Sequence, residues 1–175
     1  MQFKEFALHI DILKALEKLH YEQVLPIQEQ VIPEILKGRD VIVRSRTGSG
    51  KTASFAIPIV QELIWEEREP QAIILTPTRE LALQIKEDFD NIGAYRRIKT
   101  VAIFGKQPYK FQIQDLKQRA HVVVGTPGRI LDHLERETLK TGHIRYVIID
   151  EADEMLNMGF IESVQSIFNY FPGNK

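Results

Sequence analysis

Five short apolar runs recur along the chain. They are rich in β-branched residues and bounded by residues such as Gly, Thr or Asp, which is typical of strands buried in a parallel sheet. The runs are residues 41–43, 72–75, 101–104, 122–124 and 146–149. Segments with helical spacing lie between them, such as Leu81, Leu83, Ile85 and Phe89. This alternation predicts an α/β fold with a mainly parallel sheet and helices on both faces.

The segments outside these strands are predicted to be helices and loops. The first forty residues are predicted to be mostly helical, with Pro26 and Pro33 marking turns or helix starts. Residues 65–70 (Trp-Glu-Glu-Arg-Glu-Pro) are predicted to form a solvated loop. In open parallel sheets, ligands bind outside the carboxyl ends of the strands. The candidate functional residues follow these strand ends.

The composition narrows the class of protein to which this chain can belong. A length of 175 residues suits one domain, and 43% apolar with 27% charged residues is an ordinary globular balance. There are no cysteines, so disulfides and thiolate metal sites are excluded. The five histidines are scattered without ligand spacing, which favours solvated or packing roles. The N-terminus does not resemble a signal peptide, and no stretch reaches the length of a membrane span, so we expect a cytoplasmic protein.

The net charge is about −1. This argues against a protein that coats nucleic acid through bulk positive charge, although a local basic groove stays open. Any contact with nucleic acid must therefore come from a few placed residues.

Residues 45–52 (Ser-Arg-Thr-Gly-Ser-Gly-Lys-Thr) stand between a predicted strand and a predicted helix. Glycines there let backbone N–H groups turn toward a phosphate, and the helix N-terminus adds partial positive charge. Lys51 can reach the β- and γ-phosphates, and the Thr52 hydroxyl can bind Mg²⁺. A plain Gly-rich turn is the alternative interpretation. The predicted nucleotide-binding residues are Thr47, Gly48, Ser49, Gly50, Lys51 and Thr52.

An acidic cluster, residues 150–153 (Asp-Glu-Ala-Asp), follows the last apolar run. A carboxylate at Asp150, at the end of a buried strand, can hold Mg²⁺ through water. Glu151 would then orient or deprotonate the water that attacks the γ-phosphate. The alternative is that the cluster only caps a helix, for which Asp153 is also suited. Lys51, Asp150 and Glu151 are the predicted catalytic residues.

Together these motifs resemble the DEAD-box family of ATP-dependent RNA helicases. Residues 150–153 spell the sequence after which the family is named. Residues 77–81 resemble its motif Ia, residues 126–129 its motif Ib, and residues 26–28 the end of its Q motif. Phe3 stands where the family has an isolated upstream aromatic residue. The resemblance covers essentially the whole chain and implies an N-terminal RecA-like P-loop domain over residues 1–175, with the Q-motif region in residues 1–30.

The resemblance also implies roles. Gln28 should hydrogen-bond the adenine edge and Phe3 should stack on the base, which would select ATP. Asp153 is similar to the residue that couples ATP to RNA binding. The implied contacts with the RNA backbone are Arg79, Thr126, Gly128 and Arg129. Taken alone, residues 126–129 (Thr-Pro-Gly-Arg) would be interpreted as a strand-to-helix turn.

The chain departs from the family pattern at several positions. Ser45 and Arg46 replace the usual Ala-Gln, and Arg46 adds charge near the nucleotide or a partner domain. Val24 and Leu25 replace Pro-Thr, which removes one hydroxyl that could bond the phosphate loop. Phe104 stands in place of the first glycine of a Gly-Gly pair.

The family's second RecA-like domain, with its arginine fingers, is absent from the sequence, so we expect a piece of a longer, monomeric protein. Residues 91–106 and 154–160 resemble the bacterial DbpA/YxiN branch, which implies ribosomal RNA and ribosome assembly. Three other functions are alternatives to an RNA helicase. A nucleotide-gated RNA clamp differs in not releasing duplexes. A small-molecule P-loop kinase is disfavoured because nothing in the sequence resembles an acceptor-binding lid and Glu151 is placed for water. DNA as the main substrate disagrees with the RNA-type motifs.

Overall fold

The computed structural model describes residues 1–173, which divide into two units. The first unit comprises Met1–Ile64 and Glu87–Ile98, and the second comprises Trp65–Lys86 and the residues from Lys99 onward. The division falls inside α4 (Arg79–Ile92). The phosphate loop belongs to the first unit, and the acidic cluster belongs to the second.

The first unit is helical. Its apolar side chains recur at helical spacing, and α2 and α3 pack against each other. Phe55 of α3 and Phe89 of α4 meet with ring centroids 6.2 Å apart. The elements are the 3₁₀ helix η1 (Phe3–Phe6), α1 (Ile10–Lys18), α2 (Pro26–Leu36), α3 (Lys51–Glu62) and the 3₁₀ helix η2 (Ala94–Arg96), together with the end of α4.

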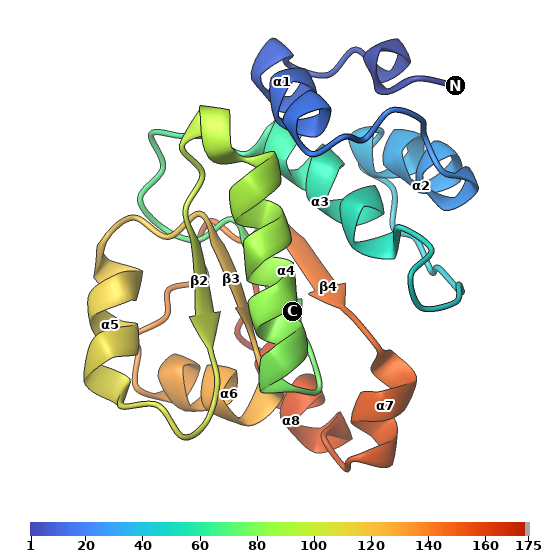
Figure 1. Cartoon of the computed structure of the whole chain (residues 1–175). Helices are drawn as coiled ribbons and strands as arrows, with labels where there is room; N and C mark the ends of the chain where they lie inside the picture. The colour runs from blue at the N-terminus through green and yellow to red at the C-terminus, as the bar shows by residue number, and fades with distance from the viewer. Residues whose placement is uncertain (174–175) are drawn as a thin grey trace. The chain divides into compact units, whose positions relative to one another are not determined.

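The second unit contains the sheet. Its four strands are all parallel and lie in the order β2-β3-β1-β4 (Figure 1). The strands are β1 (Ala72–Leu75), β2 (Thr100–Ile103), β3 (Val122–Gly125) and β4 (Tyr146–Ile149). The helices are the start of α4, α5 (Tyr109–Lys117), α6 (Pro127–Glu135), α7 (Ala152–Asn157) and α8 (Ile161–Phe168).

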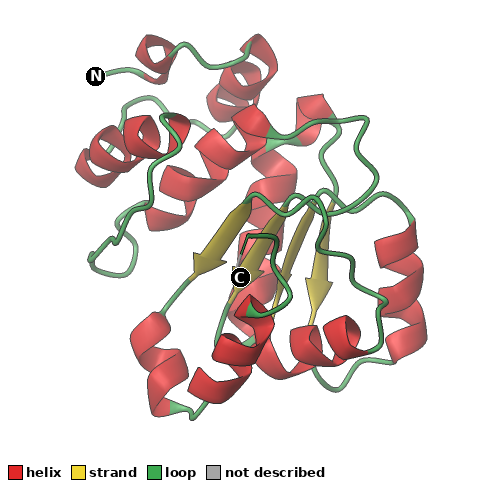
Figure 2. Ribbon diagram, turned by 180° about the vertical axis from the view of Figure 1, so that it is seen from behind, coloured by secondary structure: helices red, strands yellow, loops and turns green. Residues whose placement is uncertain are grey.

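Alternate residues of the strands face opposite sides of the sheet. One face, which includes Ile73, Val101 and Val123, forms a core with apolar residues of α5, α6, α7 and α8. Figure 2, seen from behind, shows α6 and α8 on this side. On the other face, Ile74 and Val124 are also fully buried, and α4 crosses this face in Figure 1. The predicted sheet with helices on both faces is confirmed.

The four strands also end at the same level. Leu75 pairs with both Gly125 and Ile149, and Gly125 pairs with Ile103. The ladder continues one residue further, because the Thr126 N–H donates to the carbonyl of Ile103 at 3.0 Å. The loops that follow the strands therefore leave from one edge of the sheet.

Two predictions about the first unit were wrong. Residues 41–43 form no strand, and Ile42 is fully exposed. A strand exists only where another strand pairs with its backbone, and within residues 1–173 no strand does so here. Pro33 does not begin a helix but lies inside α2, whereas Pro26 begins it as predicted.

The predicted loop at residues 65–70 has no regular structure, yet it is attached to the second unit. Trp65 stacks on His121, with ring centroids 5.0 Å apart, and the guanidinium of Arg119 lies 5.0 Å from the Trp65 ring. His143 bonds Glu69 at 2.9 Å and Glu67 at 3.2 Å.

Among residues 1–173, every helix is too short or too polar to cross a membrane.

Gly125 allows the close approach of β2 and β3. A Cβ added there would lie 2.1 Å from the carbonyl oxygen of Ile103. We expect Gly125→Ala to lower the free energy of unfolding by about 1–3 kcal/mol, because the two backbones would have to separate. Urea unfolding measures this. The control is Gly128→Ala in α6, where an added Cβ meets nothing within 4 Å and helix propensity favours Ala. Equal destabilisation by both variants would contradict this interpretation.

Candidate functional site

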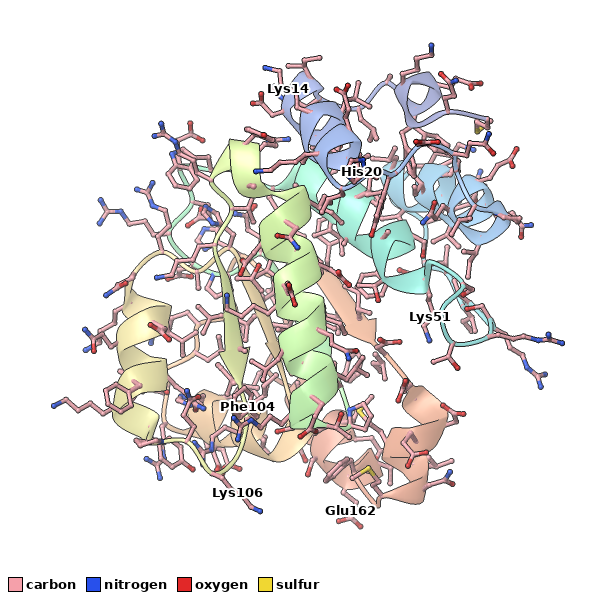
Figure 3. The ribbon with its side chains drawn as sticks, in the orientation of Figure 1. Lys14, His20, Lys51, Phe104, Lys106 and Glu162 are labelled. Atoms are coloured by element: carbon pink, nitrogen blue, oxygen red, sulfur yellow. The ribbon has the colours of Figure 1, made fainter. Side chains whose placement is uncertain are left out.

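The predicted phosphate loop precedes α3, which begins at Lys51 as expected (Figure 3). Gly48 has φ +76° and Gly50 has φ +82°, which are left-handed conformations that glycine adopts without a Cβ penalty. Gly50 is the N-cap residue of α3, and no side chain caps this helix end. Ser49 Oγ donates to Ser45 Oγ at 2.9 Å, so the serine that replaces the family's alanine closes the turn. The backbone therefore suits an anion at the start of α3.

Gln28 connects α2 to this loop. Its carboxamide accepts a hydrogen bond from the Leu25 N–H at 3.0 Å and donates one to the Gly50 carbonyl at 3.3 Å. Gln28 is buried, only 2% exposed. A Cβ on Gly50 would lie 2.7 Å from Gln28 Nε2 and 2.6 Å from Leu25 Cδ1. The chain thus links its Q-motif region to the loop without the missing threonine hydroxyl.

Phe3, the predicted base-stacking residue, lies in an aromatic cluster. It is 4% exposed, and its ring centroid is 6.4 Å from that of Phe6 and 6.3 Å from that of Tyr21. Its contact with adenine stays a prediction.

The acidic cluster follows β4. Asp150 is 5% exposed, and its N–H donates to the Leu75 carbonyl at 2.9 Å, which continues the sheet. Glu151 has φ +52°, a strained conformation for a residue with a Cβ. Although Glu151 is the N-cap residue of α7, its side chain makes no capping hydrogen bond. Asp153 is exposed in the first turn of α7. The side chain at the N-cap position therefore does not act as a cap.

The oxygen donors predicted for Mg²⁺ are the Asp150 carboxylate and the Thr52 hydroxyl. The Asp150 Oδ1 atom accepts the Glu151 N–H at 3.0 Å, which orients the carboxylate. Mg²⁺ is commonly held by one or two protein oxygens, with water and substrate phosphates completing its shell. Residues 1–173 contain no group of three His, Asp or Glu side chains that could hold a metal unaided. Each donor, taken by itself, is therefore of the oxygen type that Mg²⁺ prefers, and their binding of one ion stays a prediction.

The residues predicted to contact RNA follow neighbouring strands. Arg79 begins α4 after β1, and its guanidinium lies 5.0 Å from the ring of Phe104, which follows β2. Thr126, Gly128 and Arg129 follow β3 at the start of α6. Gly128 is exposed. Because the strand ends are level, the second unit brings these residues to the same edge as Asp150.

Arg129 belongs to a polar network that the sequence analysis missed. Its Nη1 atom donates to the Gln107 carbonyl at 2.7 Å and to Gln112 Oε1 at 3.2 Å. The Tyr109 ring lies between two guanidinium groups, 4.0 Å from that of Arg129 and 3.9 Å from that of Arg136. A signal was present in the sequence, since Gln112 and the buried Leu116 lie four residues apart on one helix face.

The network includes one fully buried imidazole, that of His133. Its Nε2 atom lies 2.7 Å from Gln112 Oε1, and its Nδ1 atom lies 2.8 Å from Thr138 Oγ1. Both Gln112 N–H groups are donated elsewhere, so the imidazole must place its hydrogen on Nε2. Burial, with the guanidinium groups of Arg129 and Arg136, lowers the pKa of His133 to about 4.

The fold and these motifs define a phosphate-loop domain of the helicase type. The family model described as DEAD/DEAH box helicase matches residues 25–175, and the chain belongs to this family.

Individual relatives are similar over nearly the whole chain. The chain is 55% identical to the ATP-dependent RNA helicase DbpA of Bacillus subtilis over 97% of its own length and 36% of the relative. It is 46% identical to the DEAD-box ATP-dependent RNA helicase CshA of Geobacillus kaustophilus over 99% of its length and 37% of the relative. It thus spans little more than a third of these relatives.

A solved structure of a DEAD box protein is also similar to this chain. The crystal structure of a DEAD box protein from the hyperthermophile Methanococcus jannaschii is 45% identical, with a TM-score of 0.95. The similarity covers 100% of this chain and 48% of that one.

The packing around Gly50 generates a test. Gly48→Ala and Gly50→Ala both place a Cβ at positive φ, but only Gly50→Ala also displaces Leu25 and Gln28. We expect Gly48→Ala to destabilise the chain by roughly 1–2 kcal/mol, because a left-handed backbone costs about that much for a residue with a Cβ. Gly50→Ala should cost more, because its Cβ also collides with Leu25 and Gln28. Thermal unfolding without nucleotide measures both. Equal losses would show that the contact between α2 and the loop is not tight.

The buried imidazole generates a prediction about pH. Its pKa is near 6.5 in the unfolded chain and about 4 when folded, so between these values the unfolded chain binds more protons. The stability that neutral His133 contributes is complete above pH 6.5 and is lost as pH falls toward 4. We expect His133→Gln to flatten the dependence of the unfolding free energy on pH in this window, as measured by urea unfolding.

His143 supplies a control of opposite sign. Its hydrogen bond to Glu69 raises its pKa, so its contribution is present at low pH and lost as pH rises through the folded pKa. His143→Gln should therefore remove a small gain in stability that accompanies acidification through the folded pKa toward pH 6.5, and leave the loss between pH 6.5 and 4 unchanged. If both variants changed the pH dependence in the same direction, the assignment of His133 would be wrong.

Proposed function

We propose that this chain is the ATP-binding and RNA-binding domain of an ATP-dependent RNA helicase. In the whole protein, ATP and RNA together would close two RecA-like domains, and closure would bend one strand of a short duplex so that it opens. The observation that carries this proposal is the shared edge of the sheet in the second unit. It holds both an acidic cluster suited to ATP hydrolysis and the basic and backbone groups suited to RNA.

The proposed roles on the ATP side follow from chemistry. N–H groups of residues 47–50 would surround the phosphates, and the Lys51 ammonium would bind the β- and γ-phosphates. Thr52 and Asp150 would hold Mg²⁺, which neutralises charge on the phosphates when bound. Glu151 would orient or deprotonate the attacking water. Phe3 and Gln28 would select adenine, and for this Gln28 would exchange its bond to Gly50 for one to the base.

On the RNA side, Arg79, Thr126, Gly128 and Arg129 would contact the sugar-phosphate backbone. Such contacts position RNA without discriminating bases, so we expect binding that is largely independent of sequence. A preference for RNA over DNA would come from backbone shape and the 2′-hydroxyl. Asp153, exposed in the first turn of α7, would couple this surface to the nucleotide.

We further propose that the whole protein is a cytoplasmic monomer with a second RecA-like domain and a role in ribosome assembly. The sequence of residues 154–160, which resembles the DbpA/YxiN branch, supports the ribosomal role. The second domain would supply arginine fingers, which contribute about 10³–10⁵-fold to rates of phosphoryl transfer. The present chain alone should therefore bind ATP or ADP weakly and hydrolyse ATP negligibly.

RNA-stimulated ATPase activity tests the proposal. We expect full-length protein to hydrolyse ATP only with RNA, and the present chain to be slower by roughly 10³-fold or more. Glu151→Gln in the full-length protein should lower the rate by about 10²–10⁴-fold, because it removes the proton acceptor.

Glu154→Gln, an equal charge change on an exposed residue of α7, is the matched control and should keep the rate. Duplex release in the same assay separates a helicase from a clamp. Turnover by the present chain as fast as full-length protein without RNA would overturn the proposal.

A further inference from the structure

The turn at which α7 meets α8 exposes three large apolar side chains of the second unit. They are Leu156, Met158 and Ile161, and 59%, 47% and 45% of their respective surfaces are exposed. Single exposed apolar residues are common on proteins, whereas a group of them on one surface marks an interaction site. Residues 156–162 are termed the α7–α8 corner below.

The backbone of the corner is fixed without these side chains. The Phe160 N–H donates to the Met155 carbonyl at 3.0 Å, and Gly159 has φ +79°, the left-handed conformation that commonly ends a helix. The Met155 side chain is 2% exposed, and Phe160 packs against the core. The corner is therefore anchored from within, and its exposed apolar surface is presented in one arrangement.

The apolar surface has an acidic rim. Residues 146–173 contain no Lys, Arg or His, but they contain Asp150, Glu151, Asp153, Glu154 and Glu162. Residues three or four apart on a helix are neighbours, so Asp153 lies beside Leu156. Glu154 lies beside Met158 for the same reason. Glu162, in the first turn of α8, points away from the domain in Figure 3. All three rim acids, Asp153, Glu154 and Glu162, are exposed.

This chemistry selects the kind of partner. Carboxylates repel RNA phosphates, so the corner is unsuited to nucleic acid. Two copies of the corner would bring like charges together, which disfavours a symmetric contact between copies. The N–H groups of residues 158–160 are bonded within the corner, so an added strand would find no donors there. A helix with an apolar stripe between cationic side chains matches both the apolar surface and its rim.

We propose that the α7–α8 corner docks a separate protein through an amphipathic helix whose apolar stripe is flanked by Lys or Arg. The stripe would cover Leu156, Met158 and Ile161, and the cations would pair with Glu154 and Glu162. Buried apolar contacts supply most of the affinity of such an interface, and rim charges set the choice of partner. The proposal goes beyond the helicase function, because none of these five residues belongs to the proposed ATP or RNA site.

The test is the binding of a fluorescein-labelled peptide of about four helical turns, made of Leu and Lys with Leu at helical spacing. Anisotropy follows its binding to the 175-residue chain. Leu156→Gln and Ile161→Gln should each weaken binding roughly tenfold, because burying such a side chain contributes at least that factor. The matched control is Ile10→Gln in α1, which changes an isoleucine that is 58% exposed and should bind as wild type.

The charge of the rim is tested separately. Glu162→Gln should weaken binding about two- to fivefold at low salt and lower its salt dependence. Glu135→Gln, which changes an exposed acid of α6, should alter neither. A peptide of Leu and Glu with the same spacing should not bind, and its binding would overturn the cationic partner. Equal binding of a Leu and Lys peptide in scrambled order would show charge attraction alone and overturn the docking site.

Other outcomes identify other occupants. If full-length protein fails to bind the peptide that the 175-residue chain binds, the remainder of the same protein covers the corner, and the separate partner is overturned. Dimers in sedimentation equilibrium that Ile161→Gln abolishes would make a second copy the occupant. If Leu156→Gln and Ile161→Gln fold by circular dichroism and bind as wild type, the peptide binds elsewhere and the proposal fails. Should either not fold, Met158→Gln in the turn takes its place.

RNA-stimulated ATPase activity separates this proposal from the proposed function. In full-length protein, Leu156→Gln and Ile161→Gln should keep the rate while they weaken peptide binding. Loss of both would assign the corner to the helicase cycle and overturn a separate docking role. If wild type lacks the ATPase activity but binds the peptide through the corner, the proposed function fails and the docking site stands.

Discussion

The level register of four parallel strands is the constraint on which the second unit depends. Leu75 pairs at the same height with residues of β3 and β4, and Gly125 does the same for β2 and β3. Each strand therefore releases its loop at one edge, although the loops are widely separated in sequence. A shift of one residue in any strand would turn its side chains to the opposite face and move its loop out of line. The buried core thus determines where the exposed chemistry lies.

The acidic and the basic residues at this edge of the second unit are fixed in place by different interactions. Asp150 follows its strand directly, and backbone pairing with β1 fixes its place. Arg129 is held by side chains instead, through Gln112 and Tyr109, and the neutral imidazole of His133 bonds the same Gln112. A buried network of this kind specifies one arrangement only while every donor and acceptor is satisfied. Its members are therefore interdependent, even though only some of them reach the surface.

Much of this architecture could be predicted from local sequence patterns. The apolar runs at 72–75 and 146–149 coincide with β1 and β4, and the runs at 101–104 and 122–124 overlap β2 and β3 closely. The start of α3 at Lys51 was also predicted, because a phosphate loop is encoded in consecutive residues. The failure at residues 41–43 has a physical reason. Apolar β-branched residues permit a strand, but only a paired backbone makes one, and pairing is not a local property.

Interactions between distant positions were harder to foresee. The bond between Gln28 and Gly50 joins residues 22 apart, and that between Gln112 and His133 joins residues 21 apart. A glutamine on a helix is usually solvated, so its type alone did not indicate a buried junction. The left-handed backbone of Glu151 was equally invisible, because a helix start after a strand ordinarily suggests a capping residue.

Trp65 has a practical consequence for how this molecule can be observed. It is the sole tryptophan in the sequence, and its indole is stacked on His121 beside Arg119, entirely within the second unit. Intrinsic indole emission will therefore report on that unit alone, whereas far-ultraviolet ellipticity at the helix bands includes the helical first unit. Coincident transitions by the two signals would indicate that the units unfold together, and separated transitions would resolve them as independent folding units without any added label.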